Sequence, residues 1–383
     1  MGEDIKLGHV AGFPLRLHWS VLVVLWLFTW SLASYTLPVD APGHAPATYW
    51  LAGLGGAVVF LGSILAHELA HAVVARRCGV KVKSLTLWMF GGIAIFGSTP
   101  KTPGKDFRIA AAGPATSLAL AAVFAGVAAG LDAFGVAHIA VSAGWWLSGI
   151  NLLIALFNLL PGAPLDGGRI LRAYLWRRNG DFTRAALGAA RTGRGIAFGL
   201  LALGLFQFLV GYGMGGLWMV FIGWFLLTAA RAEEADVLAR QALAGVRVAD
   251  VMSANPHTGP GRLTVDAFIE RYVLGHQHSA YPVERSDGGI DGLITLAQLR
   301  AVPRVERATT SVRDIAIPLA DVPTATPDQP LSELLEHLSP ATGGRVLVFD
   351  NGGLVGIVTP ADIARTIEIR DLSVPPPAAE HHR

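Results

Sequence analysis

Cysteine and charged residues are scarce in this sequence. One cysteine, Cys78, stands among 383 residues, so the chain can form neither an internal disulfide nor a cluster of thiolate metal ligands. Any metal site must therefore use histidines and carboxylates. Charged residues make up only 15% of the chain, too few to coat the surface of a soluble protein of this length. Much of the chain should face lipid instead.

Apolar side chains take the place of the missing charge. Hydrophobic residues account for 52% of the sequence, and the mean hydropathy is +0.48. They gather before position 230, whereas Asp, Glu and Arg recur every few residues from Arg231 onward. This shift predicts a membrane part followed by a soluble part. The net charge of +2, with no basic cluster interleaved with aromatics, argues against a nucleic-acid partner.

Six segments are long and apolar enough to cross a bilayer, which requires about 20 residues in a helix. They are Leu17–Leu37, Tyr49–Val74, Phe107–Phe134, Ile139–Leu160, Ile196–Tyr212 and Gly215–Ala230. The first is too long for a signal peptide and lacks a small-residue cleavage site, so it is predicted to remain as an anchored helix. The sequence thus predicts a polytopic α-helical membrane protein.

Lysine and arginine occupy alternate loops between these segments. Basic residues precede the first segment and follow the second, fourth and sixth, and the loop around Lys81 and Lys101 is also basic. The other loops, near 38–47 and 131–138, contain no lysine or arginine. The positive-inside rule then predicts that both termini and the soluble part are cytoplasmic, in a multi-pass protein of the cell membrane. A soluble core of buried helices would not produce this alternation.

The second apolar segment contains the string His67-Glu68-Leu69-Ala70-His71. Residues four apart lie on one face of a helix, so both imidazoles can converge on one Zn²⁺. Glu68 is then placed to take a proton from a metal-bound water and pass it to the leaving amine. The alternative is a His–Glu pair that only packs two helices, although ionisable groups in a span are costly without a function.

A catalytic zinc usually takes three protein ligands, and Asp166 is the candidate for the third. It follows the fourth segment in Asn-Leu-Leu-Pro-Gly-Ala-Pro-Leu-Asp-Gly-Gly-Arg, from Asn158 to Arg169, at the predicted depth of the HExxH string. Its prolines and glycines favour a loop that can aim a carboxylate sideways. Taken alone, Asp166 is better explained as a plain helix cap before Gly167-Gly168-Arg169.

The HExxH string in an early span, with the Leu-Asp-Gly string after a later one, resembles the site-2 protease family, the peptidase M50-like intramembrane zinc metalloproteases. The resemblance covers about residues 1–230 and includes Gly91-Gly92 and Gly113-Pro114. It implies that His67, His71 and Asp166 hold one zinc ion per chain and that Glu68 is the general base. Asn158 matches the family position of a polar group near the substrate carbonyl. Its alternative is an amide that satisfies backbone groups near a helix break.

Residues 80–96, between the second and third segments, alternate apolar and polar side chains before becoming apolar. Gly91-Gly92 suits a turn, so the pattern predicts a re-entrant β-hairpin near the active site. A peptide cut inside a membrane helix must first unwind, and an edge strand would hold it by β-augmentation. The alternative is a hairpin that only packs. The small residues of 110–117 are assigned to helix packing, without a chemical role.

Beyond Arg231, a charged helix leads into two similar units that repeat after roughly 60 residues. Each has a short string (from Val248 and from Val312), an amphipathic helix and two apolar strands. The repeat resembles an α/β tandem CBS domain pair over about 246–371. The predicted organisation is a transmembrane zinc metalloprotease domain (1–235), a linker helix (236–245), two CBS domains (246–305 and 306–371) and a disordered tail (372–383).

The CBS resemblance implies that Thr359 and Asp362, in Thr-Pro-Ala-Asp, hold the phosphate and ribose of an adenine nucleotide such as ATP or AMP. The first unit has Thr295-Leu296-Ala297-Gln298 there, where Gln298 replaces the carboxylate. At most one nucleotide site is therefore complete. The alternative is a purely structural pair, or one that forms a homodimer.

The sequence therefore predicts a zinc metalloprotease that cuts membrane-anchored proteins within or near a transmembrane segment and is regulated through its CBS pair. The class suggests substrates such as anti-sigma or signalling factors, with the lipid bilayer as the medium. A CBS-gated transporter or channel is the main rival, but it would show paired repeats with broken helices at the midplane. A proteolytically dead scaffold is the second, and the intact Glu68 argues against it.

Overall fold

The structure, a computed structural model, describes residues 5–89, 91–96, 99–275, 278–336, 338 and 340–373. The chain divides into two compact units, Met1–Val237 and Leu238–Arg383. Most of the tail that was predicted to be disordered lies outside the described residues.

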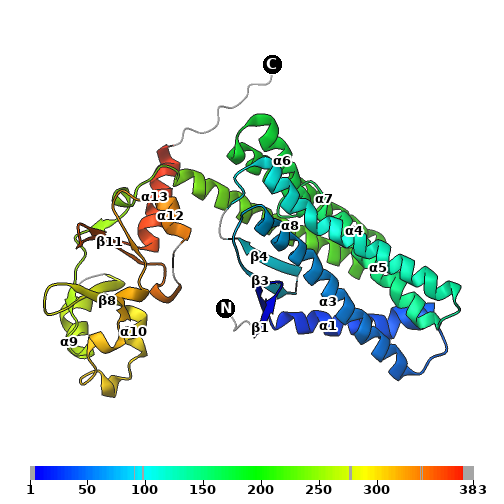
Figure 1. The fold of residues 1–383 in the computed structure, drawn as a ribbon, viewed down its shortest axis with the longest axis horizontal. Coiled ribbons are helices and arrows are strands. Elements are labelled where there is room, and N and C mark those ends of the chain that lie inside the picture. Colours follow the sequence, from blue (N-terminus) through cyan, green and yellow to red (C-terminus); the bar gives the residue numbers. More distant parts are fainter. Residues whose placement is uncertain are drawn as a thin grey trace. The chain divides into compact units, whose positions relative to one another are not determined.

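The first unit consists mainly of long helices (Figure 1). They are α1 (Ser20–Ser31), α2 (Leu37–Asp40), α3 (Pro46–Arg77), α4 (Pro103–Ala133), α5 (His138–Asn158), α6 (Asp166–Asn179), α7 (Phe182–Gln207) and α8 (Met214–Ala242). A π-helical turn, Leu32–Thr36, joins α1 to α2, and another, Phe208–Tyr212, follows α7. Within the described part of the chain, six helical stretches are long and apolar enough to cross a membrane, which agrees with the predicted number of spans.

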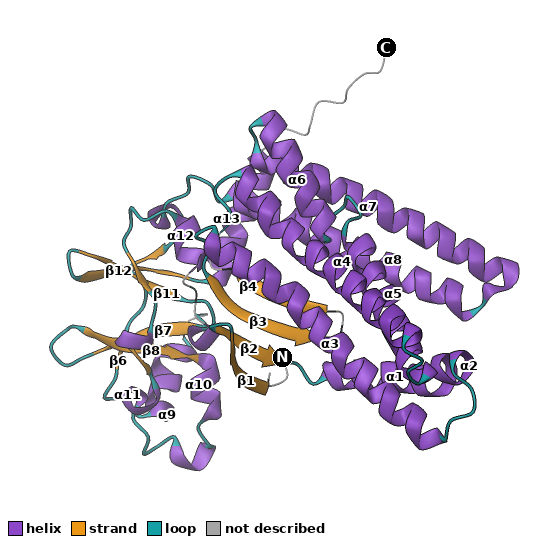
Figure 2. Cartoon of the chain, turned by 45° about the vertical axis from the view of Figure 1, so that its right-hand side comes forward, coloured by secondary structure: helices purple, strands orange, loops and turns teal. Residues whose placement is uncertain are grey.

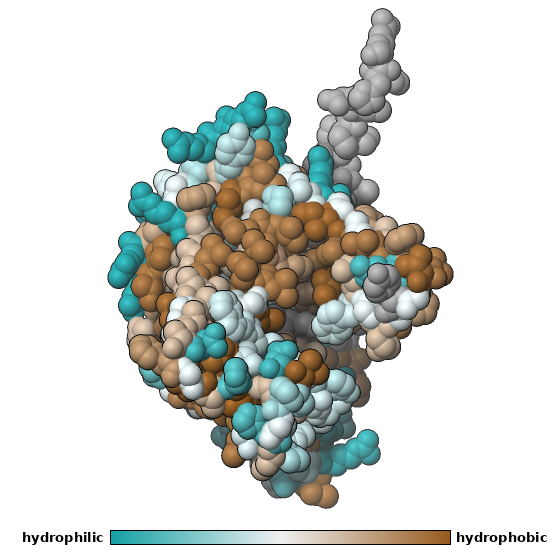
Figure 3. Space-filling view, turned by 90° about the vertical axis from the view of Figure 1, so that its right-hand side faces the viewer, coloured by the Kyte–Doolittle hydropathy of each residue, from teal (hydrophilic) through white to brown (hydrophobic). Residues whose placement is uncertain are grey.

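Four of the six helical stretches described are longer than the apolar segments that predicted them. For example, α7 begins at Phe182, although the apolar segment begins only at Ile196. Its first half buries the small residues Ala185, Ala186 and Ala189 within the unit. Hydropathy locates the part of a helix that faces lipid, and it overlooks such a small-residue packing face. Many large apolar side chains of the long helices are exposed, and Figure 3 shows apolar residues over much of one face of the molecule.

A four-stranded sheet in the order β1-β2-β3-β4 accompanies these helices. Its strands are β1 (Ile5–Val10), β2 (Phe13–Leu17), β3 (Val82–Trp88) and β4 (Gly91–Phe96). The antiparallel pairing of β3 with β4 confirms the predicted hairpin, and β2 joins β3 in parallel. Figure 2 shows the sheet beside α3. Strands β1 and β2 were not predicted from the sequence.

The sheet is fastened to the end of α3 by one arginine. Arg76 donates a hydrogen bond to the carbonyl of Ala11, in the β1–β2 turn, at 2.9 Å. Its guanidinium also lies 4.5 Å from the centre of the Phe13 ring. Leu15 and Leu85 are buried in the same cluster as Ala72 of α3. The sheet and α3 therefore share one core, which fixes β4 relative to the HExxH residues.

The second unit contains two α/β repeats. The first repeat contains β6 (Gly259–Pro260), α9 (Val265–Phe268), β7 (Ala280–Glu284), β8 (Ile290–Thr295) and α10 (Leu296–Ala301). The second contains β10 (Thr324–Ala325), α12 (Leu331–Glu336), β11 (Val346–Asp350), β12 (Gly353–Val358) and α13 (Pro360–Ser373). The linking elements are β5 (Ser253–Ala254), α11 (Val312–Ile315) and β9 (Ile317–Pro318).

The two sheets have equivalent topologies, β6-β7-β8-β9 and β10-β11-β12-β5. Each sheet has a parallel first pair, a central antiparallel hairpin, and a short strand at the far edge. The short strand β5, which precedes the first repeat, completes the sheet of the second. This exchange, with a buried cluster that joins Leu293 to Leu347, ties the repeats into one unit. The charged segment predicted as a separate linker helix continues α8 to Ala242 without a break.

Candidate active site

Helix α3 presents two histidines on one face. His67 and His71 are 5% and 4% exposed, and their Nε2 atoms lie 3.3 Å apart. The spacing of four residues accounts for this approach, because it brings side chains one helical turn apart into line. The predicted convergence of these two imidazoles is therefore present in the structure.

Asp166, the first residue of α6, joins the two histidines although it lies 99 residues beyond His67. Its Oδ2 atom lies 3.2 Å from Nε2 of His67 and 3.2 Å from Nε2 of His71. These three are the group of His, Cys, Asp and Glu side chains that lies close enough to hold a metal ion among the described residues. Asp166 does begin a helix, but its carboxylate turns towards α3.

The spacing of the three atoms fits zinc. Bonds of 2.0–2.2 Å to an ion at the centre of a tetrahedron place neighbouring ligand atoms about 3.3 Å apart. The three distances here are 3.2, 3.2 and 3.3 Å. Two imidazoles and one carboxylate also form the donor set of a catalytic zinc site that keeps a fourth position open. Geometry and chemistry thus agree on a zinc centre.

The outer nitrogens of both imidazoles are held by α4. Nδ1 of His71 lies 2.7 Å from the carbonyl oxygen of Ile109, and Nδ1 of His67 lies 2.9 Å from the Ser117 hydroxyl. A carbonyl only accepts, so Nδ1 of His71 carries the proton, and Nε2 is the ring atom that faces Asp166. This arrangement orients both rings for a metal.

Gly113 of α4 packs directly against the two imidazoles. A Cβ atom at this position would overlap Nε2 of both His67 and His71. Only glycine lets the α4 backbone come this close to the imidazoles. At about 100° per residue, Asp106, Ile109, Gly113 and Ser117 fall within about 80° of the α4 circumference. All four are buried, and they are called the α4 stripe below.

The environment of Asp166 keeps its carboxylate ionised. Burial raises the pKa of this group, but the contacts with His67 and His71 outweigh burial and hold the pKa below its usual range. The position at the N-terminus of α6 also favours negative charge. An ionised carboxylate is the form in which aspartate binds zinc.

Glu68 lies between the metal ligands and the sheet. It is half-buried, and a Cβ atom at Gly92 of β4 would overlap its Cγ atom. The strand β4 is therefore packed against the predicted general base, and Gly92 provides the space for its side chain. Because β4 is the last strand of the sheet order, one of its edges is unpaired within the described sheet.

The remaining predicted residues are placed differently. Asn158, the last residue of α5, is half-buried, and its side chain makes no hydrogen bond with a described residue. Asp362 accepts hydrogen bonds from the backbone and hydroxyl of Thr359, at 2.9 and 2.6 Å, and from Ser253 at 3.2 Å. Gln298 accepts equivalent bonds from Thr295 in the first repeat. The Thr-x-x-Asp/Gln string thus forms a helix cap in both repeats, and its nucleotide role remains a prediction.

The contacts of α4 with the ligand imidazoles were not predicted from the sequence. The run of small residues was assigned to packing alone, whereas Ser117 contacts His67 and Gly113 makes room for both rings. A buried serine in an apolar span was a signal that could have been followed, since such a hydroxyl needs a partner. The contribution of Ile109 is its backbone carbonyl, so the identity of its side chain gives no indication of it.

The chain is similar to known metalloproteases. The family model described as Peptidase family M50 matches residues 55–139 and 133–202, and that of the CBS domain matches residues 312–369. The protein named "Putative zinc metalloprotease Rip3" of Mycobacterium tuberculosis is 57% identical over 378 residues, which are 98% of this chain and 96% of that protein.

Two proteins of Methanocaldococcus jannaschii are also similar. Zinc metalloprotease MJ0392 is 27% identical over 376 residues, which are 97% of this chain and 98% of that protein. The solved structure of a Site-2 Protease has 26% identity and a TM-score of 0.40, and the alignment covers 61% of this chain and 95% of that one.

Proposed function

We propose, from the premise that this chain belongs to peptidase family M50 and is a zinc metalloendopeptidase, that it cuts membrane-anchored proteins within or near a transmembrane segment. The observation that carries the proposal is the group of His67, His71 and Asp166, whose two histidines belong to α3, a helix long and apolar enough to span a membrane. Water and peptide must meet there, at the level of the membrane.

The residues of the site have distinct roles in this proposal. A zinc ion held by His67, His71 and Asp166 would supply Lewis acidity and make its bound water a nucleophile near neutral pH. Glu68 accepts the proton of the attacking water and returns it to the leaving amine. Asn158 contributes a polar amide near the substrate carbonyl. Ser117 and the Ile109 carbonyl hold the ligand imidazoles in the required tautomer and orientation.

The distribution of basic residues supports a cytoplasmic location of both termini and of the CBS unit. Arg76 and Arg77 end α3 close to the ligands, so the metal centre lies near the cytoplasmic end of the spans. Substrates would be regulators anchored in the same membrane, such as anti-sigma or signalling factors. Cleavage there would release their cytoplasmic parts.

Replacing Asp166 tests the metal centre. We expect Asp166→Ala to lose bound zinc and to cleave a model transmembrane substrate below detection, because two imidazoles alone leave the ion poorly held. Purified wild type should contain one zinc per chain, and a chelator should remove both metal and activity. Zinc content by atomic absorption and cleavage by gel assay are the measurements. Wild type without metal, or Asp166→Ala with metal and full activity, would refute the proposed site.

The unpaired edge of β4 is proposed to hold the unwound substrate. Its proximity to Glu68, through Gly92, supports this role. A peptide added to the edge as a further strand would present its carbonyls along the line of β4, next to the general base. The strand would also supply the backbone hydrogen bonds that the peptide loses when its helix unwinds.

Proline substitution at consecutive positions of β4 tests this role. Successive amides of a strand point to opposite sides, so one of Ile93→Pro and Ala94→Pro removes a bond to β3 and the other removes a donor from the free edge. We expect the variant that removes a donor from the free edge to lose cleavage while keeping its zinc content and thermal stability. Unchanged cleavage in both variants would contradict the role.

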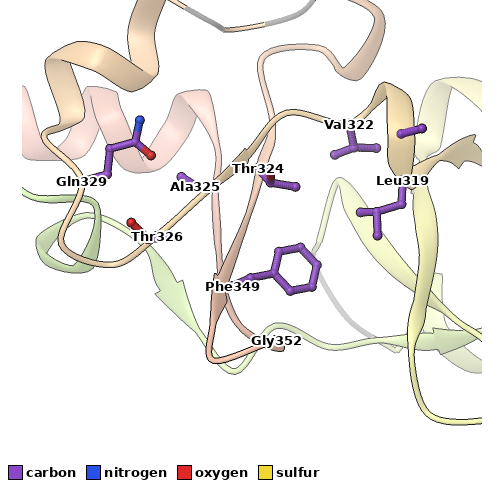
Figure 4. Close-up of a pocket in the computed structure, with 9 residues that line it drawn as sticks. Leu319, Val322, Thr324, Ala325, Thr326, Gln329, Phe349 and Gly352 are labelled. Carbon is purple, nitrogen blue, oxygen red and sulfur yellow. The ribbon is translucent and has the colours of Figure 1, made fainter.

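The CBS unit is proposed to regulate cleavage by binding an adenine nucleotide, and two copies of the unit are proposed to form a homodimer. The second repeat contains an open pocket of about 800 Å³. Figure 4 shows the apolar Leu319 and Val322 at one end, Phe349 between, and the polar Thr326 and Gln329 at the other. These side chains suit an aromatic base. Among the described residues, no charged side chain lines this pocket, and neither Thr359 nor Asp362 does.

Calorimetry with ATP and AMP tests the nucleotide proposal. We expect one nucleotide per full-length chain, and about 10-fold weaker binding in Asp362→Asn, which loses a charged acceptor. Phe349→Ala reports separately on the pocket. Loss of binding in Phe349→Ala alone would move the site away from Asp362, and absence of binding to wild type would leave the unit a structural module.

A further inference from the structure

A buried ion pair joins α4 to α6, outside the metal centre. Asp106, in the first turn of α4, is fully buried. Arg172 of α6 donates to it twice, from Nε to Oδ2 at 2.9 Å and from Nη2 to Oδ1 at 2.9 Å. Such a bidentate pair fixes both distance and orientation. Arg169 adds a longer contact, of 3.7 Å, to the same carboxylate.

This pair lies a fixed distance from the zinc ligands on both helices. On α4, Asp106 is seven residues, about 10 Å, from Gly113, which abuts the imidazoles. On α6, Arg172 is six residues, about 9 Å, from Asp166. Helix α6 is therefore held at two places about 9 Å apart: Arg172 contacts Asp106 of α4, and Asp166 contacts the two histidines of α3, against which Gly113 of α4 packs. Two such points determine how far α6 is shifted along α4 and how it is rotated.

The loop before α6 is packed so tightly that it cannot compensate for a displacement of α6. A Cβ atom at Gly167 would overlap the carbonyl oxygens of Leu159 and Leu160, and one at Gly168 would overlap Ala163. The position of the Asp166 carboxylate thus follows the placement of the whole helix. A metal site loses affinity when such outer partners are removed, typically 10- to 100-fold.

We propose that Arg172 is a positioning residue: by clamping Asp106 it holds α6 so that Asp166 meets His67 and His71 at the zinc ion. The inference rests on the proposed metal centre and adds a residue that touches neither metal nor substrate. Arg172 also has an ion pair with Glu233 of α8 at 3.5 Å, but Glu233 is 39% exposed, so Asp106 is the stronger partner. The clamp therefore acts through α4.

Full-length variants loaded with Co²⁺ in place of zinc test the proposal, because the visible absorption of cobalt reports ligand geometry. We expect Arg172→Gln to bind Co²⁺ and Zn²⁺ at least 10-fold more weakly, with a shifted absorption band and a lower kcat at similar KM. Arg172→Lys keeps the charge but not the bidentate geometry and should recover part of the affinity. Asp106→Asn, which keeps the size of the side chain, should reproduce Arg172→Gln and replaces it if that variant does not fold.

Two controls separate positioning from general stability. Arg194→Gln removes a 2.6 Å ion pair with Glu234 between α7 and α8, and Glu233→Gln removes the ion pair that Arg172 makes with α8. Both should keep wild-type cobalt spectra and metal affinity within about 2-fold. The proposal is overturned if Arg172→Gln and Asp106→Asn bind cobalt like wild type, or if Glu233→Gln reproduces their effect. Wild type that binds no cobalt would overturn the proposed function and this inference together. If wild type binds cobalt and the Arg172 and Asp106 variants bind it equally well, only this inference is overturned.

Discussion

Glu68→Gln should abolish proteolysis and leave the metal in place. Glu68 stands outside the group of His67, His71 and Asp166, so the amide variant keeps all three ligands. It cannot accept the proton of the attacking water, and general acid–base catalysis is worth about 10²–10⁴-fold in rate. We expect cleavage of a model transmembrane substrate to fall by that factor, with zinc content unchanged.

His67→Ala is the matched comparison for Glu68→Gln, because it should lose zinc and activity together. Measuring metal content and cleavage on the same preparations distinguishes a base from a ligand. Should Glu68→Gln cleave at a rate near that of wild type, another group must take the proton. Should it lose zinc instead, the carboxylate of Glu68 would belong to the coordination sphere.

Gly113→Ala should have an effect as large as the loss of a ligand. The added methyl would occupy the space between the two Nε2 atoms, where the ion is expected. Alanine favours a helix over glycine by about 1 kcal/mol, so the helical conformation of α4 itself is compatible with the change. We expect zinc affinity to fall by on the order of 100-fold or more, with cleavage below detection and the protein still folded.

Gly126→Ala is the control for that substitution. It lies in the same helix, and a Cβ atom there meets nothing within 4 Å. Zinc affinity and cleavage should match wild type, while the temperature of unfolding stays equal or rises slightly. Zinc binding by Gly113→Ala equal to that of Gly126→Ala would mean that α4 does not approach the imidazoles as closely as described.

The sequence predicted the spans and the candidate ligands because each depends on a simple physical rule. A lipid environment requires long apolar helices, and a spacing of four residues brings His67 and His71 together on any helix. Asp166 was harder, because a single aspartate before two glycines is also a normal helix start. The resemblance to a family and its predicted depth in the membrane singled it out. The repeated α/β units followed from their period.

The parts that were not predicted depend on groups that the sequence does not distinguish. The carbonyl of Ile109 is present in every residue, and Gly113 acts through the side chain that it lacks. Strands β1 and β2 contain glycine, proline and charged residues, and they form because β2 finds a parallel partner in β3. The ion pair of Asp106 with Arg172 joins residues 66 apart, and neither belongs to a recognisable string.

The α4 stripe also makes the enzyme vulnerable to changes in length. Consecutive residues of an α-helix are turned by about 100°, so one residue inserted between Ile109 and Gly113 would swing Gly113 and Ser117 away from the imidazoles. The HExxH string, Asp166 and every side chain of the stripe would still be present. A relative with such an insertion would carry all the motifs of a protease and have no working metal centre, and only the count of residues along α4 would reveal it.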